Sequence, residues 1–242
     1  YHFVETPENS SGDTIEIILV SPYTNMSGTL NDIQYGHPAA VEDFLMAQHG
    51  YKVYISLFML VSALIFSFIN YLFFYKKNPY NVFLGIFGVF ISLWLFAESR
   101  IVQLYINNDF LIGSLAYLSL AATPIAAIAF IKSHLFKEDR FIFSSLCVIF
   151  TLNLVINIFL HISGIAAFFE TVTITIVLIS IAFIISFLLL VKNYINEKKK
   201  EYRNFLIISI VFSIFLFLEV YEFANKNFSI TAIFVTTGIA TI

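Results

Sequence analysis

The sequence contains little charge. Lys, Arg, Asp and Glu together make up 12% of its 242 residues, whereas a soluble globular domain carries about 25%. It contains a single cysteine, Cys147, which excludes an intrachain disulfide and is expected to pack as a small apolar side chain. The apolar part has no phosphate-binding loop, dinucleotide fingerprint, nucleophile elbow or zinc-binding helix motif. These absences argue against a soluble, disulfide-rich or catalytic domain, and they predict no cofactor, no metal site and no nucleic-acid partner.

The first fifty residues differ from the rest, because they contain seven acids and no Lys or Arg. Thr14–Val20 is typical of a β-strand, which Pro22 would end. Pro38 can open a short helix, and Gly50 is a natural place for that helix to stop. One strand and one short helix cannot bury a core of their own. We therefore expect residues 1–50 to be the C-terminal remnant of a larger β-rich domain, a β-sandwich that is incomplete in this chain.

Residues 51–242 are dominated by apolar runs, and 59% of the whole chain is hydrophobic. The predicted membrane spans are Tyr54–Tyr75, Tyr80–Ala97, Phe110–Ile131, Phe141–Ser163, Ala166–Val191, Phe205–Glu222 and Phe228–Ile242. A helix needs ~20 residues to cross the hydrocarbon core, so the first six are long enough, while we expect the seventh to be cut short. Lipid cannot satisfy an exposed backbone, so the spans must be helical. The predicted fold is an all-α membrane protein, a seven-transmembrane helix bundle that follows the β-rich remnant.

The positions of Lys and Arg predict the orientation of the bundle. Ten of the thirteen basic residues follow odd-numbered spans and so share one side of the membrane: Lys76, Lys77, Lys132, Lys137, Arg140, Lys192, Lys198, Lys199, Lys200 and Arg203. The positive-inside rule places this side in the cytoplasm. Residues 1–50 are then extracytoplasmic, and the C-terminus is cytoplasmic. We expect a multi-pass protein of the plasma (inner) membrane, with the lipid bilayer as one partner.

Polar side chains within the spans gather toward the outer side. The fourth span carries Asn153, Asn157 and His161 at i, i+4 spacings, so they share a stripe that rises from mid-membrane to the outer end. An unpaired acid near the bilayer centre costs roughly 2.5–3.5 kcal/mol on insertion scales, so such residues normally face a bundle interior or a wet cavity. The candidate ligand-binding residues are Glu98, Arg100, Asn153, Asn157, His161, Glu170, Glu219 and Glu222.

Two interpretations of these residues stay open. The first is an outward-facing polar pocket, lined by Glu98, His161, Glu170 and Glu219, that takes an unknown small cationic ligand, a metal or a proton. The second is that these side chains are solvated at headgroup depth, or pair with Arg100 and one another to hold helices together. The asparagines of the fourth span could likewise be satisfied by hydrogen bonds between helices, with no ligand.

A proline and a basic cluster also have alternative roles. Pro124 in the third span should kink that helix and free backbone carbonyls, and the kink is either a hinge or static. A cytoplasmic anchor at the inner leaflet, where anionic lipid attracts basic residues, is formed by Lys198, Lys199, Lys200 and Arg203. A specific lipid site is the other interpretation of this cluster.

Several short motifs resemble those of the bacterial seven-transmembrane receptors with diverse intracellular signalling modules. They are Ser21-Pro22-Tyr23, Gly36, the stretch from Trp94 through Glu98-Ser99 with Gln103, Tyr117-Leu118-Ser119 and Pro124. The resemblance covers nearly the whole chain and is greatest to the membrane regions of diguanylate cyclases. It implies a cytoplasmic output domain that this chain lacks, such as a GGDEF diguanylate cyclase or a histidine kinase. It also implies that a homodimer signals by rearrangement.

The leading functional hypothesis is therefore a sensor region that relays an extracytoplasmic or membrane signal to an output domain, for a diguanylate cyclase by changing cyclic di-GMP. A transporter or channel subunit is the alternative. It predicts internal repeats and interrupted helices that meet at the midplane, and the sequence shows no convincing repeat. A membrane-embedded enzyme would need acids or histidines clustered at one depth, and their spacing here matches no reaction that we can name.

Overall fold

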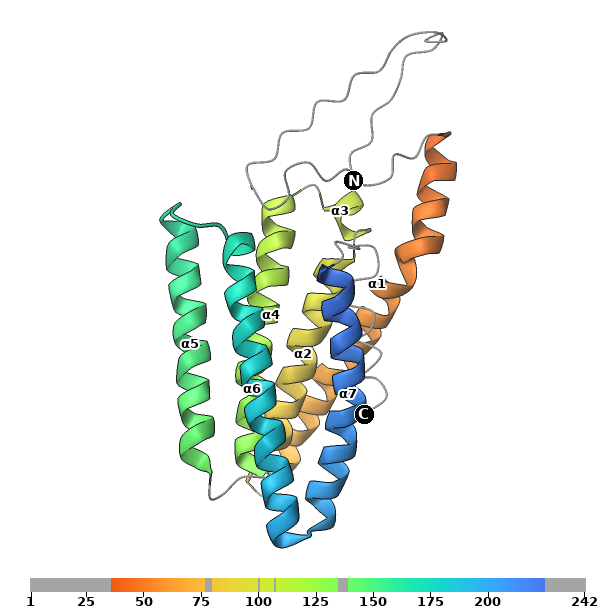
Figure 1. Cartoon of the computed structure of the whole chain (residues 1–242). Coiled ribbons are helices and arrows are strands. Elements are labelled where there is room, and N and C mark those ends of the chain that lie inside the picture. Colours follow the sequence, from red (N-terminus) through yellow and green to blue (C-terminus); the bar gives the residue numbers. More distant parts are fainter. Residues whose placement is uncertain (1–35, 77–79, 100, 107, 135–138, 225–242) are drawn as a thin grey trace, which may run out of the picture.

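The computed structural model describes residues 36–76, 80–99, 101–106, 108–134 and 139–224. Its regular elements are α1 (Pro38–Ile69), a π-helical turn η2 (Asn70–Phe74), α2 (Tyr80–Glu98), α3 (Val102–Tyr105), α4 (Asp109–His134), α5 (Arg140–Ile162), α6 (Phe168–Glu197) and α7 (Lys200–Ala224). The long helices alternate in direction, and the turn between α6 and α7 marks the lower end of the bundle in Figure 1. No strand occurs among the described residues, and the predicted strand Thr14–Val20 lies outside them.

Five helical stretches in the described part of the chain are long and apolar enough to cross a membrane. They are Gly50–Phe74, Tyr80–Glu98, Phe110–Ser133, Arg140–Ile162 and Phe168–Glu197. They overlap the first five predicted spans, so the prediction of a helical, multi-pass membrane protein is confirmed. The sixth predicted span falls within α7, which is not among the five. The seventh, Phe228–Ile242, lies outside the described residues.

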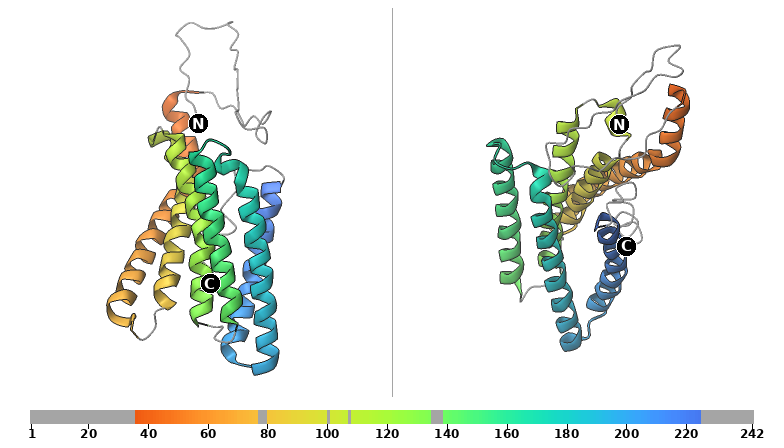
Figure 2. Two further views of the ribbon diagram at one scale, coloured as in Figure 1. Left: turned by 90° about the vertical axis from the view of Figure 1, so that its left-hand side faces the viewer. Right: turned by 45° about the horizontal axis from the view of Figure 1, so that its top comes forward.

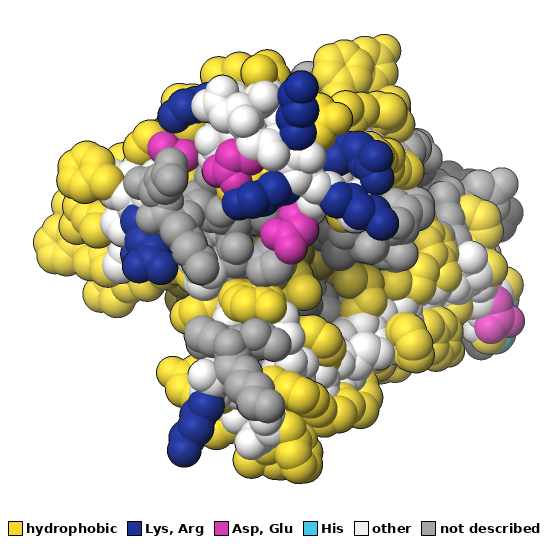
Figure 3. Space-filling view, turned by 90° about the horizontal axis from the view of Figure 1, so that it is seen from below, with side chains coloured by type: hydrophobic (Ala, Val, Ile, Leu, Met, Phe, Trp, Pro, Cys, Tyr) yellow, Lys and Arg dark blue, Asp and Glu magenta, His cyan; other side chains and the backbone are white. Residues whose placement is uncertain are grey.

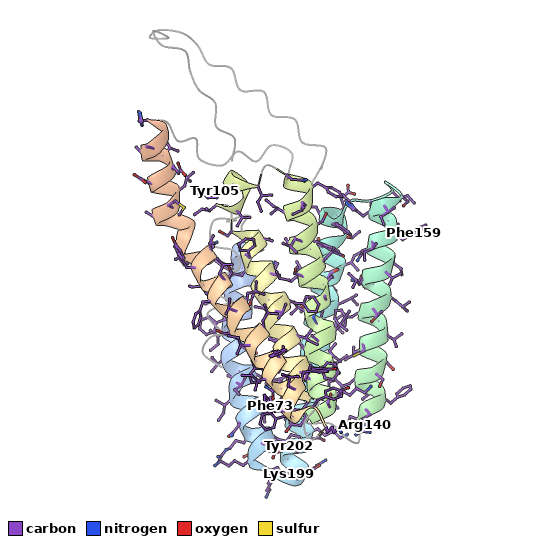
Figure 4. All side chains as sticks on the ribbon, turned by 180° about the vertical axis from the view of Figure 1, so that it is seen from behind. Phe73, Tyr105, Arg140, Phe159, Lys199 and Tyr202 are labelled. Carbon is purple, nitrogen blue, oxygen red and sulfur yellow. The ribbon has the colours of Figure 1, made fainter. Side chains whose placement is uncertain are left out.

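Large apolar side chains cover the outside of the bundle. Phe58, Phe73 and Phe159 are 75%, 72% and 65% exposed, and Figure 4 shows Phe159 on the outer side of α5. Burying one such side chain is worth about 1.5–3 kcal/mol, so this surface would be unfavourable in water. In lipid the cost disappears, and the apolar exterior is the three-dimensional counterpart of the long hydrophobic runs.

Helix α1 continues through Gly50 without a break, so the prediction that Gly50 ends a short helix is wrong. A glycine inside a helix costs only about 0.5–1 kcal/mol relative to alanine, and the apolar residues after it extend the helix into the membrane. The predicted domain boundary between residues 50 and 51 therefore falls inside helix α1. At its lower end α1 widens into η2, where the Asn70 side-chain amide donates a hydrogen bond to the Phe66 carbonyl oxygen (2.9 Å).

Helices α1 and α2 cross where a glycine lets the two backbones approach. A Cβ added to Gly85 would lie 3.0 Å from the Cα of Ser67. Beside this crossing, the Asn81 side-chain amide donates a hydrogen bond to Asn70 Oδ1 (2.9 Å) and so ties the two helices together. The upper end of α1 leans away from the rest of the bundle (Figure 2, right).

The buried side chains form three clusters. One packs Ala97, Val102 and Ile112 of α2, α3 and α4 together with Val53 of α1, and the other two are layers between the later helices. The lower layer joins α4, α5, α6 and α7 through Ile128, Phe143, Leu146, Phe150, Ala182, Leu190 and Tyr202. The upper layer joins α4 and α6 through Tyr117, Ala121 and Phe168, with partly buried residues of α5 packed against them. α4 is a single helix across Pro124, and a hinge at this residue stays a prediction.

Candidate functional site

Three helices bring together a hydrogen-bonded group in the upper half of the bundle. Thr175 on α6 is 0% exposed, and its Oγ1 accepts a hydrogen bond from Asn153 Nδ2 on α5 (2.9 Å). The same hydroxyl is hydrogen bonded to the hydroxyl of Tyr117 on α4 (3.2 Å). Thr171, one turn earlier on α6, donates to the Phe168 carbonyl (3.0 Å), and its hydroxyl oxygen lies 3.5 Å from that of Tyr117. We refer to Tyr117, Asn153, Thr171 and Thr175 as the polar cluster.

Asn157 lies one turn beyond Asn153 on the same face of α5 and is 3% exposed. Its side-chain nitrogen has no hydrogen-bond partner among the described residues. A buried donor that is left unpaired costs about 1–3 kcal/mol, so helix packing by itself does not account for an amide at this position. Among the described residues, Asn157 is therefore a buried donor without a partner, one turn above the polar cluster.

A column of stacked rings leads from the upper surface toward the polar cluster. Phe110, at the start of α4 and 68% exposed, stacks on His161 near the end of α5, with ring centroids 5.4 Å apart. His161 stacks on Phe168 of α6 at 3.9 Å, and Phe168 stacks on Tyr117 at 4.5 Å. Such pairs contribute about 0.5–1.5 kcal/mol beyond the area they bury. The column thus connects an imidazole near the membrane surface to a hydroxyl of the polar cluster.

The structure brings Asn153, Asn157 and His161 to one region, on the face of α5 that their spacing indicates. Glu170 has a different place, because it is exposed in the first turn of α6. Its carboxylate accepts a hydrogen bond from the backbone N–H of Ala167 (2.9 Å). A carboxylate is favourable at a helix N-terminus, so capping accounts for Glu170 without a ligand.

The remaining candidate residues lie on other elements or outside the described part of the structure. Glu98 is half-buried at the last residue of α2. Glu219 and Glu222 lie on α7, and their side chains lie outside the described part of the structure, as does the whole of Arg100. A pocket lined by these acids therefore stays a prediction.

The sequence pattern did not single out Tyr117, Thr171 and Thr175 as site residues. The two threonines repeat at the same i, i+4 interval as Asn153 and Asn157, so α5 and α6 offer matched polar stripes. That match is a signal that could have identified the threonines. Tyr117 offered no such signal, because its hydroxyl reaches the cluster from a third helix.

The opposite end of the bundle carries many basic side chains, with a few acids among them (Figure 3). The predicted anchor residues Lys198, Lys199, Lys200 and Arg203 are all exposed at the turn between α6 and α7. Lys199 forms an ion pair with Glu197, and its ammonium lies 5.9 Å from the ring centre of Tyr202. The hydrogen bond to the Glu197 carboxylate raises the pKa of Lys199.

Neither a metal site nor a known relative narrows the function further. The described residues include no group of three or more His, Cys, Asp or Glu side chains able to hold a metal ion. Fold and site together define the class, a helical, multi-pass membrane protein with a polar cluster buried between three of its helices. The chain matches no protein-family model, no curated protein and no solved structure.

Proposed function

We propose that this chain is the membrane-embedded sensor region of a bacterial receptor, and that it relays an extracytoplasmic or membrane signal to a cytoplasmic output domain. The buried, unpaired amide of Asn157 carries this proposal. A small molecule that enters from the upper end and accepts a hydrogen bond from Asn157 pairs a donor that has no partner among the described residues. Because an unpaired buried donor costs about 1–3 kcal/mol, this pairing stabilises the helix arrangement that presents it.

The polar cluster links α5, where such a molecule would bind, to two other helices. Thr175 on α6 contacts Asn153 on α5 and Tyr117 on α4, so a shift of one helix changes the hydrogen bonds of the other two. A ligand moves an equilibrium only through its different affinities for two states. Hydrogen bonds that form in one arrangement and break in another supply that difference.

The lower layer favours a receptor over a transporter or channel. Phe143 and Phe150 are 0% and 1% exposed, and they pack with Leu190 between α5 and α6. The buried hydroxyl of Ser186 donates to the Ala182 carbonyl of its own helix (2.8 Å) instead of lining a path. A polar solute would have to pass these apolar groups, whereas a signal crosses them when helices move.

In the proposed orientation the basic end of the bundle faces the cytoplasm and the polar cluster lies in the outer half of the membrane, in keeping with the positive-inside rule. The membrane is then the plasma (inner) membrane, and the output domain lies on the cytoplasmic side. The sequence resemblance favours a GGDEF diguanylate cyclase as that domain, with a histidine kinase as the other option. In a homodimer, movement of the helices brings two output domains into register.

The coding sequence beyond Ile242 provides a first test. A cyclase or kinase domain there supports the proposal, whereas an immediate stop or further membrane spans would contradict it. In the full-length protein, we expect Asn157→Leu and His161→Ala to change cyclic di-GMP production or autophosphorylation at unchanged membrane abundance. Thr151→Val is the matched control, because Thr151 is exposed on the same helix and bonds to the Cys147 carbonyl of that helix. Unchanged output in both variants would show that these residues are structural.

A further inference from the structure

An apolar pocket lies away from the polar cluster, between the upper half of α1 and the junction of α2 with α3. Its volume is about 190 Å³. The inner lining consists of Met46, Gly50, Val53, Phe96, Ile101 and Val102. An apolar cavity of about 150 Å³ stays dry and binds benzene in another protein, so this pocket has room for a segment of hydrocarbon.

The pocket lies just above the level at which α1 packs against the end of α2. The two helices contact each other from the crossing of Gly85 with Ser67 up to Val53, which packs against the cluster of Ala97, Val102 and Ile112, and the upper end of α1 leans away from the bundle (Figure 2, right). Near the upper end, the Tyr105 hydroxyl next to the pocket donates a hydrogen bond to the Glu42 carboxylate of α1 (3.3 Å). The pocket is therefore a wedge, closed below by the packing of Val53 against the upper end of α2 and crossed near its top by one polar bond.

The mouth of the wedge is continuous with the surface that faces lipid. Tyr54 and Tyr105 at the rim are each 67% exposed, and Ile106 beside them is 37% exposed. The wedge lies at the upper ends of the spans Gly50–Phe74 and Tyr80–Glu98, the depth at which tyrosines are enriched in membrane proteins. Its polar groups are at the rim, and its interior is apolar. This distribution fits a molecule with a polar head and a hydrocarbon tail.

We propose that the wedge binds one acyl chain of a phospholipid from the leaflet at the upper end of the bundle, and that the bound chain sets the separation of α1 from α3. The site stands independently of the sensor function. Where both hold, the lipid chain is a second input to the receptor, because it acts on the helix that begins at Pro38, before the first span.

Gly50 offers a way to fill the wedge. A Cβ added to Gly50 would meet Ile101 Cδ1 and Met46 Cε at 3.8 Å, which is ordinary van der Waals contact. Gly50→Ala is therefore tolerated, and Gly50→Leu places a side chain where the acyl chain would lie. Gly113 on α4 is the matched control, because it is exposed and no atom lies within 4 Å of an added Cβ. Gly113→Leu makes the same chemical change on a surface that faces lipid.

The test uses the whole chain in phosphatidylcholine vesicles that contain some phosphatidylcholine with a photoreactive diazirine in its acyl chain. After illumination, mass spectrometry of peptides compares labelling of Met46, Val53 and Phe96 with labelling of Phe159 on the exposed face of α5. We expect the wedge residues to be labelled several-fold more than Phe159. The labelling should fall in Gly50→Ala, disappear in Gly50→Leu and persist in Gly113→Leu.

Thermal unfolding establishes which variants are folded, and Gly50→Ala decides the question if Gly50→Leu does not fold. Wedge labelling no greater than that of Phe159, or unchanged labelling in the folded Gly50 variants, overturns the proposal. Labelling by a water-soluble apolar carbene precursor but not by the acyl probe also overturns it, because the wedge would then hold a free small molecule. Since the readout is labelling and not signalling, failure of the sensor proposal leaves this result intact.

Discussion

The crossing of α1 and α2 depends on the missing side chain at Gly85, and replacing this glycine tests how tightly the helices pack. In Gly85→Ala the added Cβ would overlap Ser67 Oγ and lie 3.0 Å from both the Cα and the Cβ of Ser67. The serine hydroxyl can rotate away. The backbone atom can move only if α1 shifts, and the Asn81–Asn70 hydrogen bond resists that shift.

The expected magnitude is the balance of two opposing terms. Overpacking a close contact costs about 1–3 kcal/mol, whereas replacing a glycine inside a helix by alanine gains about 0.5–1 kcal/mol. We therefore expect Gly85→Ala to lower the free energy of unfolding by about 1–2 kcal/mol. Gly113→Ala is the matched control, since its new Cβ meets open space and it should gain about 0.5–1 kcal/mol.

Reversible unfolding of the purified chain in mixed micelles measures these differences. Ser67→Ala provides a second arm, because it removes a buried hydroxyl that has no hydrogen-bond partner among the described residues. We expect Ser67→Ala to be neutral or stabilising alone, and to restore part of the stability lost in Gly85→Ala, since the contacts with Cα and Cβ remain. Equal stability of Gly85→Ala and Gly113→Ala, or no coupling in the double-mutant cycle, would refute the close crossing.

Thr175→Val keeps the shape of the side chain but removes the partner of Asn153 and Tyr117, so we expect unfolding measurements to show a loss of about 1–3 kcal/mol; a loss no larger than in Thr151→Val would contradict the cluster. Asn157→Leu removes an unpaired buried donor and should raise the free energy of unfolding, and a decrease would mean that the amide is paired. The Glu42 carboxylate raises the pKa of Tyr105 above its ordinary value of 10.0. The folded state therefore holds this proton more tightly, and the stability it contributes is fully present below about pH 10 and lost as the pH rises through the raised pKa. Glu42→Gln should lower the pKa of Tyr105 in an NMR titration of its ring carbons, and an unchanged titration would argue against the contact.

Much of the helical framework could be predicted from the sequence, because the bilayer acts on each segment separately. A span needs ~20 apolar residues and must satisfy its own backbone, so the apolar runs alone identify the five spans found in the described part of the chain. The pitch of a helix likewise places Asn153, Asn157 and His161 on one face before any packing is known. Gly50 marks the limit of such local rules, since a glycine can either end a helix or lie inside one, depending on the residues after it.

Only the tertiary structure decided which helices meet. The hydrogen bond between Tyr117 and Thr175 depends on the fit of α4 against α6, and no local pattern encodes that fit. The unpaired amide of Asn157 and the apolar wedge between α1 and α3 arise in the same way, from side chains of different helices that do or do not reach one another. The sequence by itself determined which segments are long and apolar enough to cross a membrane, because length and apolarity belong to each segment alone. The polar cluster could be identified only from the structure, because the packing of the helices decides which of their side chains contact each other.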